Sequence, residues 1–142
     1  VKALRPGCKV IGAEPANADD AFRSKEAHTM LGHKGPIDTI ADGLKMPLGT
    51  WTYPIVEEKV DDIFLVTEEE IAASLKAVWE RMKVAIEPSA AVGVAAVVSP
   101  AFKKKYPKLK RVAVIFCGGN CDLASIGGVL RGAGDVEQLS KL

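Results

Sequence analysis

Three carboxylates lie close together near the start of the chain, directly after a short apolar run. Glu14, Asp19 and Asp20 fall within residues 14–20 (EPANADD). Mg²⁺, Mn²⁺ and Ca²⁺ prefer oxygen ligands from carboxylates, backbone carbonyls and waters, so Glu14 and Asp20 could clamp a divalent cation with one carbonyl between them. Asp19 and Asp20 could instead cap the following helix. From the residues alone, capping is the favoured interpretation.

A second candidate site follows the apolar run at residues 111–116 (RVAVIF), which breaks into Cys117, Gly118, Gly119 and Asn120. An uninterrupted run rich in β-branched residues predicts a strand that is covered on both faces. Paired glycines after such a strand let the backbone approach a ligand at the carboxyl edge of the sheet. A tight turn carrying a half-buried cysteine is an equally good interpretation.

Cys117 could also be a nucleophile, but a nucleophilic thiol needs a base close to it. The two histidines of the chain, His28 and His33, fall on a polar helix end and in a loop, where we expect them to be solvated. The pattern therefore disfavours a Cys–His hydrolase.

Glu87 is the third candidate, because it is a carboxylate inside an otherwise apolar stretch. A buried carboxylate is costly unless it has a partner. Pro88 suits the first position of a helix, which would place Glu87 at the helix cap. Capping and ligand contact are equally supported for this residue.

The elements that would position these residues alternate between strand and helix patterns. The predicted strands are residues 8–13, 62–66 and 111–116. The predicted helices are residues 21–28, residues 67 to about 86, a buried helix over residues 88–98, and a helix or turn after Asp122. Residues 29–49 are predicted to be a long irregular loop. This alternation predicts an α/β fold with parallel strands.

The apolar side chains of the second predicted helix recur with a helical period. This period places Trp79 and Met82 on the same face as Ile71 and Leu75. We therefore expect both residues in the core.

Composition limits the function classes. The 142 residues contain 48% hydrophobic and 26% charged residues, as expected for one globular domain. A net charge of +1 gives no electrostatic reason to expect nucleic acid or an anionic membrane as a partner. The basic run at residues 103–105 is expected to be a solvated turn. Three cysteines without metal-site spacing indicate reduced thiols and a cytoplasmic protein.

Five motifs, taken in order, resemble the carboxyl-terminal half of the serine racemase and serine/threonine dehydratase family. They are residues 14–20 (EPANADD), 39–43 (TIADG), 66–71 (VTEEEI), 86–93 (IEPSAAVG) and 117–123 (CGGNCDL). The resemblance covers residues 8–125 and is highly specific, since order and spacing both match. It implies a fold type II pyridoxal-phosphate (PLP) enzyme, similar to the tryptophan synthase β subunit. Residues 1–142 would form the carboxyl-terminal part of its large domain.

The resemblance also implies roles for single residues. Glu14, the carbonyl of Ala18 and Asp20 match the divalent-cation site of the family. The positions beside the cofactor ring match Gly43, Glu87, Cys117 and Gly118, and Asp42 belongs to the same loop as Gly43. At the position of Cys117, the side chain partners the pyridine nitrogen, and the racemases usually carry serine there. Lys83 and Asn120 match positions associated with an ATP effector at the interface of a homodimer.

The resemblance further implies what the chain does not contain. The Schiff-base lysine, the serine of the opposite face and the phosphate-binding loop of the family match nothing here. A chain that starts at Val1, with a strand expected at once, is predicted to be a fragment that pairs with an amino-terminal portion. With that portion, the expected activities are serine racemisation and elimination to pyruvate and ammonia. The alternative is a non-catalytic α/β module that retains only a metal site.

Overall fold

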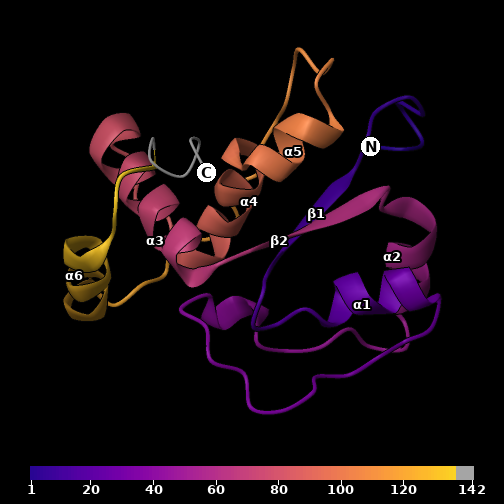
Figure 1. Ribbon diagram of the computed structural model, residues 1–142, viewed down its shortest axis with the longest axis horizontal. Helices are drawn as coiled ribbons and strands as arrows, with labels where there is room; N and C mark the ends of the chain where they lie inside the picture. Colours follow the sequence, from indigo (N-terminus) through magenta and orange to yellow (C-terminus); the bar gives the residue numbers. More distant parts are fainter. Residues whose placement is uncertain (137–142) are drawn as a thin grey trace.

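The computed structural model describes residues 1–136, in which helices pack around a short parallel sheet (Figure 1). The elements in chain order are β1 (Ile11–Pro15), α1 (Asp20–Ala27), the 3₁₀ turn η1 (Asp42–Leu44), α2 (Tyr53–Lys59), β2 (Asp62–Val66), α3 (Glu68–Ala77), the π-helical turn η2 (Val78–Met82), α4 (Pro88–Val98), α5 (Pro100–Lys105) and α6 (Leu123–Gly132). The predicted α/β alternation is confirmed.

The sheet consists of β1 and β2, which run parallel, with Ile11 opposite Asp62 and Pro15 opposite Val66. The chain crosses from one strand to the other through α1, η1 and α2, as parallel pairing requires. β2 has the predicted bounds. β1 begins three residues later than predicted, because the amide of Val10 donates to the Asp61 carboxylate at 2.7 Å before the ladder starts.

The predicted strand at residues 111–116 is not present in the structure. A strand forms only where its backbone groups pair with a neighbour, and no strand within residues 1–136 lies beside this run. The side chain of Ile115 is 80% exposed, whereas Val114 is half-buried and lies against α4, close to Gly93. The apolar pattern therefore predicted burial, but it carried no information on a partner strand.

Helix α3 begins as the sequence predicts and ends earlier. Thr67 and Glu70 form a complete capping box, with the Glu70 amide donating to Thr67 Oγ1 at 3.3 Å and the Thr67 amide donating to Glu70 Oε2 at 2.8 Å. The helix passes into η2 and stops at Lys83, which has a φ of 59°. The predicted end near Ile86 is therefore wrong.

The widened turn of η2 also changes which side chains reach the core. Trp79 packs partly buried against the core, and its Nε1 donates to the carbonyl of Ile86 at 2.9 Å. Met82 is 57% exposed, so its predicted place in the core is wrong. A π-helical turn adds one residue to the ring closed by each hydrogen bond, so the residues after it rotate away from the face that an α-helical period predicts.

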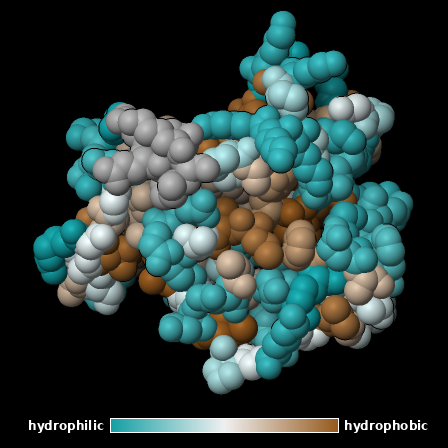
Figure 2. Space-filling view, viewed as in Figure 1, coloured by the Kyte–Doolittle hydropathy of each residue, from teal (hydrophilic) through white to brown (hydrophobic). Residues whose placement is uncertain are grey.

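Helix α4 is the centre of the core, as its apolar sequence predicts. It contacts α3, α5 and both strands, and Ala91, Val92 and Ala95 are almost completely buried. Its small side chains permit this close approach to the sheet. Figure 2 shows apolar atoms exposed in the middle of the face on which β1 and β2 lie in Figure 1, with polar atoms around them.

Two short helices were not predicted. α2 has only seven residues and starts at a Tyr-Pro pair, and α5 covers the basic run that we expected to be a turn. Lys103 and Lys104 are exposed on α5, while Lys105 pairs with Asp62 at 2.5 Å.

The helix after Asp122 is confirmed as α6, with the Asp122 side chain accepting from the Ser125 amide at 2.9 Å. No helix in the described part of the chain is long and apolar enough to cross a membrane.

Asp61 ties the segment before β1 to the sheet, and its contacts predict a dependence of stability on pH. Lys2 and Lys9 donate to its carboxylate at 2.5 and 3.3 Å. The hydrogen bond from Lys2 is the main reason why the pKa of Asp61 lies well below its ordinary value. The bonds from the Val10 amide and from Lys9 lower this pKa further. The charged Asp61 therefore stabilises the folded protein at any pH above about 3.9, the pKa of an aspartate in the unfolded chain. This stabilisation is lost as the pH falls from there toward the lower pKa that Asp61 has in the folded protein.

We therefore expect Asp61→Asn to lower the melting temperature of the protein at pH 7. The difference from wild type should shrink as the pH is lowered below about 4. Melting curves at a series of pH values measure both effects. A difference that stays constant from pH 7 to pH 3 would contradict this role of Asp61.

Candidate functional site

The carboxylates of residues 14–20 are brought together at the carboxyl end of β1. Glu14 accepts hydrogen bonds from the amides of Ala21 (3.2 Å) and Phe22 (2.8 Å), so Glu14 satisfies the free N–H groups of the first turn of α1. Asp19 stands at the N-cap but makes no capping bond and pairs instead with Arg23 at 2.8 Å. Asp20 accepts from the Leu48 amide at 2.8 Å. The prediction that Asp19 and Asp20 cap the helix is therefore wrong.

The electrostatics of this cluster show a crowded negative charge. Burial raises the pKa of Glu14 to about 7, and the nearby charge of Asp20 adds to the increase. Asp20 is 2% exposed and Ala18 is 1% exposed. Within residues 1–136, no three His, Cys, Asp or Glu side chains are grouped to hold a metal ion. A cation here would take the two carboxylates together with backbone carbonyl and water oxygens, a donor set that suits a hard ion.

His33 belongs to this cluster, and no pattern in the sequence indicates it. Its side chain is only 14% exposed, and Nδ1 lies 3.4 Å from Asp20 Oδ1. The prediction that His33 is solvated is therefore wrong. His28 is solvated as predicted, with a side chain 80% exposed beside Glu57. His33 lies in the irregular loop of residues 29–49, and no local sequence pattern predicts that this loop brings it next to Asp20.

The second site forms where three separate segments meet at Glu87. The Glu87 amide donates to the Gly118 carbonyl at 3.2 Å, and Glu87 Oε2 accepts from the Asn120 amide at 3.1 Å. Glu87 stands at the N-cap of α4 but its side chain makes no capping bond. Of the two interpretations left open by the sequence, capping is therefore excluded. The carboxylate instead holds the turn that carries Cys117.

Glycines are required on both sides of Glu87. Gly118 has a φ of 106°, and a Cβ there would lie 2.4 Å from Glu87 Cδ. A Cβ on Gly43 would lie 2.9 Å from Ser89 Oγ and 3.7 Å from Glu87 Oε1. The Gly43 amide donates to Asp42 Oδ1 (2.9 Å) and to Ser89 Oγ (3.0 Å). These contacts build a cradle in which backbone comes close to a carboxylate, and Ser89 is the member that sequence analysis missed.

The remaining predicted residues of this group are Cys117, Asn120 and Lys83. Cys117 is exposed and is a free thiol, next to Gly118. Asn120 touches Glu87 through its amide. Lys83 is exposed at the end of η2 and donates to the carbonyl of Glu80. The structure thus brings Gly43, Glu87, Gly118 and Asn120 together, and within residues 1–136 Lys83 makes no hydrogen bond to any of them.

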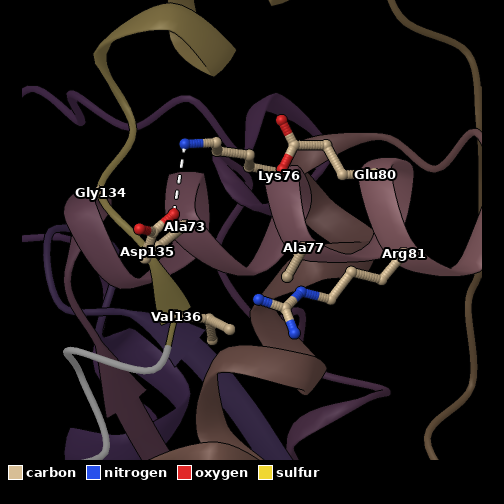
Figure 3. A pocket seen from close by; sticks show the side chains of 8 residues that line it. All are labelled: Ala73, Lys76, Ala77, Glu80, Arg81, Gly134, Asp135 and Val136. Atoms are coloured by element: carbon tan, nitrogen blue, oxygen red, sulfur yellow. Dashed lines mark hydrogen bonds and ion pairs between the residues drawn. The ribbon is translucent and has the colours of Figure 1, made fainter.

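Two surface hollows lie elsewhere, on α3, and neither contains a predicted site residue. The first is lined by residues of α3, η2 and the segment after α6, and Figure 3 shows Lys76 reaching Asp135, an ion pair of 3.4 Å. Its cavity of about 10 Å³ has room for a single water. The second, of about 270 Å³, lies between α3 and α6 beside Glu68 and Glu69. Neither hollow therefore adds a residue to the two clusters above.

Comparisons with known proteins identify the family of the chain. The family model described as pyridoxal-phosphate dependent enzyme matches residues 1–118. Serine racemase of Homo sapiens is 50% identical over 125 residues, which are 88% of this chain and 37% of the human protein. The structure of maize serine racemase superposes with a TM-score of 0.83 at 38% identity, over 92% of this chain and 40% of that one. The crystal structure of a T.th. threonine deaminase gives a TM-score of 0.77 at 39% identity, covering 87% of this chain and 44% of the other.

The chain thus spans about two fifths of the length of these relatives. The predicted resemblance is confirmed, and so is the fold class that it implies, since the matched solved structures share both sequence and architecture with this chain. The chain belongs to the family of pyridoxal-phosphate dependent enzymes, of fold type II, in the branch of the serine racemases and threonine deaminases.

Proposed function

We propose that this chain forms one side of the active site of a serine racemase that also eliminates water and ammonia from serine. The observation that supports the proposal is the convergence of Gly43, Glu87 and Gly118 in one place, where the glycine backbone comes close to the Ser89 and Glu87 side chains. The substrates are L-serine and D-serine, with L-threonine and 3-hydroxyaspartate as further candidates. The products of elimination are pyruvate, or the matching keto acid, and ammonia.

The cradle would hold pyridoxal phosphate by its ring. When bound, this cofactor supplies an electron sink for the charge left when the substrate α-proton departs. Gly43 and Gly118 let the Ser89 and Glu87 side chains come close to the backbone beside the ring, and Glu87 fixes the turn of residues 117–120 there. Residues that bind the phosphate and carry the cofactor would come from the amino-terminal portion of the enzyme, and the active assembly would be a homodimer in the cytoplasm.

Cys117 would face the pyridine nitrogen and leave it unprotonated, because a thiol is a weak, neutral donor. An aspartate at that place would hold a proton on the nitrogen and strengthen the electron sink. A weak sink favours prompt elimination or return of the proton to the substrate. The thiol in place of the usual serine changes the strength of one hydrogen bond and leaves the reaction class the same.

Two variants of Cys117 test this role in the complete enzyme. A neutral hydrogen bond contributes about 0.5–1.5 kcal/mol, so Cys117→Ser should change kcat/KM for L-serine by less than roughly tenfold. Cys117→Asp should lower the elimination rate by more than roughly tenfold, since it alters the charge at the ring. Steady-state pyruvate formation measures both. Equal rates for the two variants would contradict contact of residue 117 with the ring nitrogen.

The cluster at the end of β1 would hold a divalent cation, Mg²⁺, Mn²⁺ or Ca²⁺. Glu14, the Ala18 carbonyl and Asp20 would be its protein ligands. The closeness of the Glu14 and Asp20 carboxylates, which adds to the raised pKa of the buried Glu14 side chain, supports this assignment. The cation would hold β1, α1 and the loop at Leu48 together. It would therefore raise the stability of the folded protein and fix the position of the loop that carries Gly43.

An ATP effector would bind at Lys83 and Asn120 near the interface of the homodimer. The link of Asn120 to Glu87 gives such an effector a route to the cofactor, because a shift of the Asn120 amide moves the carboxylate that holds Gly118.

The activity itself is tested on the complete enzyme with its full amino-terminal portion. With L-serine, we expect D-serine on a chiral column and pyruvate in a coupled assay, both in proportion to enzyme concentration. Turnover of L-aspartate or of tryptophan precursors alone, with no product from serine, would overturn the proposed substrate class.

A further inference from the structure

Ser89 joins two parts of the cradle that are far apart in the sequence. Its Oγ accepts a hydrogen bond from the Gly43 amide at 3.0 Å, across 46 residues. The same amide donates to Asp42 Oδ1 at 2.9 Å. Asp42 belongs to the loop itself and moves with it, so of these two bonds only the one to Ser89 ties the Gly43 backbone to another element, the first turn of α4.

The Gly43 backbone packs directly on the Ser89 side chain. A Cβ on Gly43 would lie 2.9 Å from Ser89 Oγ and 3.4 Å from Ser89 Cβ. The same Cβ would lie 3.7 Å from Glu87 Oε1. The bond to Ser89 therefore also sets how close the Gly43 backbone comes to the Glu87 carboxylate.

The other side of the cradle is held by the same turn of α4. The Glu87 amide donates to the Gly118 carbonyl at 3.2 Å, and Glu87 Oε2 accepts from the Asn120 amide at 3.1 Å. Ser89 follows two residues later, after Pro88, whose ring fixes φ at about −65°. The first turn of α4 is thus a stiff spacer between two backbone segments, and Glu87 and Ser89 each hold one of them.

We propose that Ser89 is a positioning residue for pyridoxal phosphate, and that it acts through the Gly43 amide. It sets the distance between the loop of residues 42–44 and the turn of residues 117–120, which form the two sides of the cradle. This inference rests on the proposed function and deepens it. Within residues 1–136, the bond from Gly43 is the one hydrogen bond of the Ser89 side chain, so its role there is that of an acceptor.

A second tie keeps the loop in place when the Ser89 hydroxyl is removed. The Ile40 amide donates to Glu68 Oε2 at 2.8 Å, and Ala41 is completely buried. Both contacts remain in Ser89→Ala, and alanine is a good helix former in the first turn of α4. We therefore expect this variant to fold and to lose only the tie at Gly43.

The test compares wild type, Ser89→Ala and Ser89→Thr in the complete enzyme. Hydrogen exchange of peptides that contain Gly43, read by mass spectrometry without cofactor, reports on the loop, and equilibrium dialysis gives the affinity for pyridoxal phosphate. A neutral hydrogen bond changes an equilibrium constant by about 2- to 10-fold. In Ser89→Ala, we expect the exchange to become faster and the affinity to fall, each by about this factor. Ser89→Thr retains the hydroxyl, so both should stay within about twofold of wild type.

Ser99→Ala is the matched control for a general loss of stability. Ser99 lies at the opposite end of α4, and its hydroxyl accepts from the Phe102 amide at 3.1 Å as the cap of α5. Removal of this cap should lower the melting temperature. The exchange at Gly43 and the affinity for pyridoxal phosphate should stay within about twofold of wild type, because this bond does not touch the cradle.

The outcomes separate this inference from the proposed function. If the wild type binds pyridoxal phosphate and Ser89→Ala binds it equally well, Ser89 is not a positioning residue and the proposed function stands. An equal loss of affinity in Ser99→Ala would trace the effect to general stability and would also overturn the inference. If the complete wild-type enzyme binds no pyridoxal phosphate, the proposed function and the role of Ser89 are both wrong.

Discussion

Replacing Gly118 with alanine should remove the cofactor from the enzyme. Gly118 has a φ of 106°, and its new Cβ would lie 2.4 Å from Glu87 Cδ. The conformation alone costs about 1–3 kcal/mol for a residue with a side chain. The collision adds to this, because either the Glu87 side chain or the turn must move, and both movements break the hydrogen bond between the Asn120 amide and Glu87 Oε2. We expect the affinity for pyridoxal phosphate to fall by roughly 100-fold or more.

Equilibrium dialysis of the complete enzyme against pyridoxal phosphate measures this loss. Gly128→Ala is the matched control, because Gly128 lies in α6 and no atom is within 4 Å of its added Cβ. That variant should bind the cofactor like wild type and melt at the same or a slightly higher temperature, since alanine is the better helix former. Wild-type cofactor affinity in Gly118→Ala would show that the cradle does not hold the ring.

Replacing Asp20 with asparagine should abolish the response of the enzyme to divalent cations. The asparagine oxygen can still accept from the Leu48 amide, so the loop keeps its hydrogen bond while the charge is lost. A cation present at 100 times its dissociation constant stabilises the folded state by about 2.7 kcal/mol. In the wild type, a chelator should therefore lower the melting temperature by roughly 5–10 °C, and in Asp20→Asn it should have almost no effect.

Asp19→Asn is the control for this experiment. Asp19 is adjacent in sequence, but its half-buried carboxylate pairs with Arg23 one turn along α1 and accepts no bond from the loop at Leu48. The Asp19 variant should keep the full response to chelator and to added Mg²⁺. An Asp20 variant that keeps the wild-type response would remove the cation site from this part of the chain.

Features set by neighbouring residues could be predicted from the sequence. The capping box of Thr67 and Glu70 and the start of α4 at Pro88 depend on residues three or fewer positions apart, and both appear as expected. The bounds of β2 and the burial of α4 also follow from the local apolar pattern. The resemblance of five short motifs supplied the family, and Gly43, Glu87 and Gly118, which it groups beside one cofactor, lie together in the fold.

Features that depend on distant partners could not be predicted. Residues 111–116 have the composition of a buried strand, yet pairing needs a neighbour that the described residues do not provide. Met82 leaves the core because of one widened turn in η2. His33 meets Asp20 only because the chain that follows α1 returns to the first residue of that helix. In each case the position of the side chain depends on geometry outside its own segment.

The central claim is that this chain lines the ring of pyridoxal phosphate in a serine racemase with elimination activity. The most direct measurement is the visible absorption spectrum of the complete enzyme before and after addition of L-serine, with pyruvate and D-serine assayed in the same sample. We predict an absorption band of protein-bound pyridoxal phosphate that changes on addition of serine, and both products. No cofactor band in the complete enzyme, or a band that serine leaves unchanged while neither product forms, would contradict the claim.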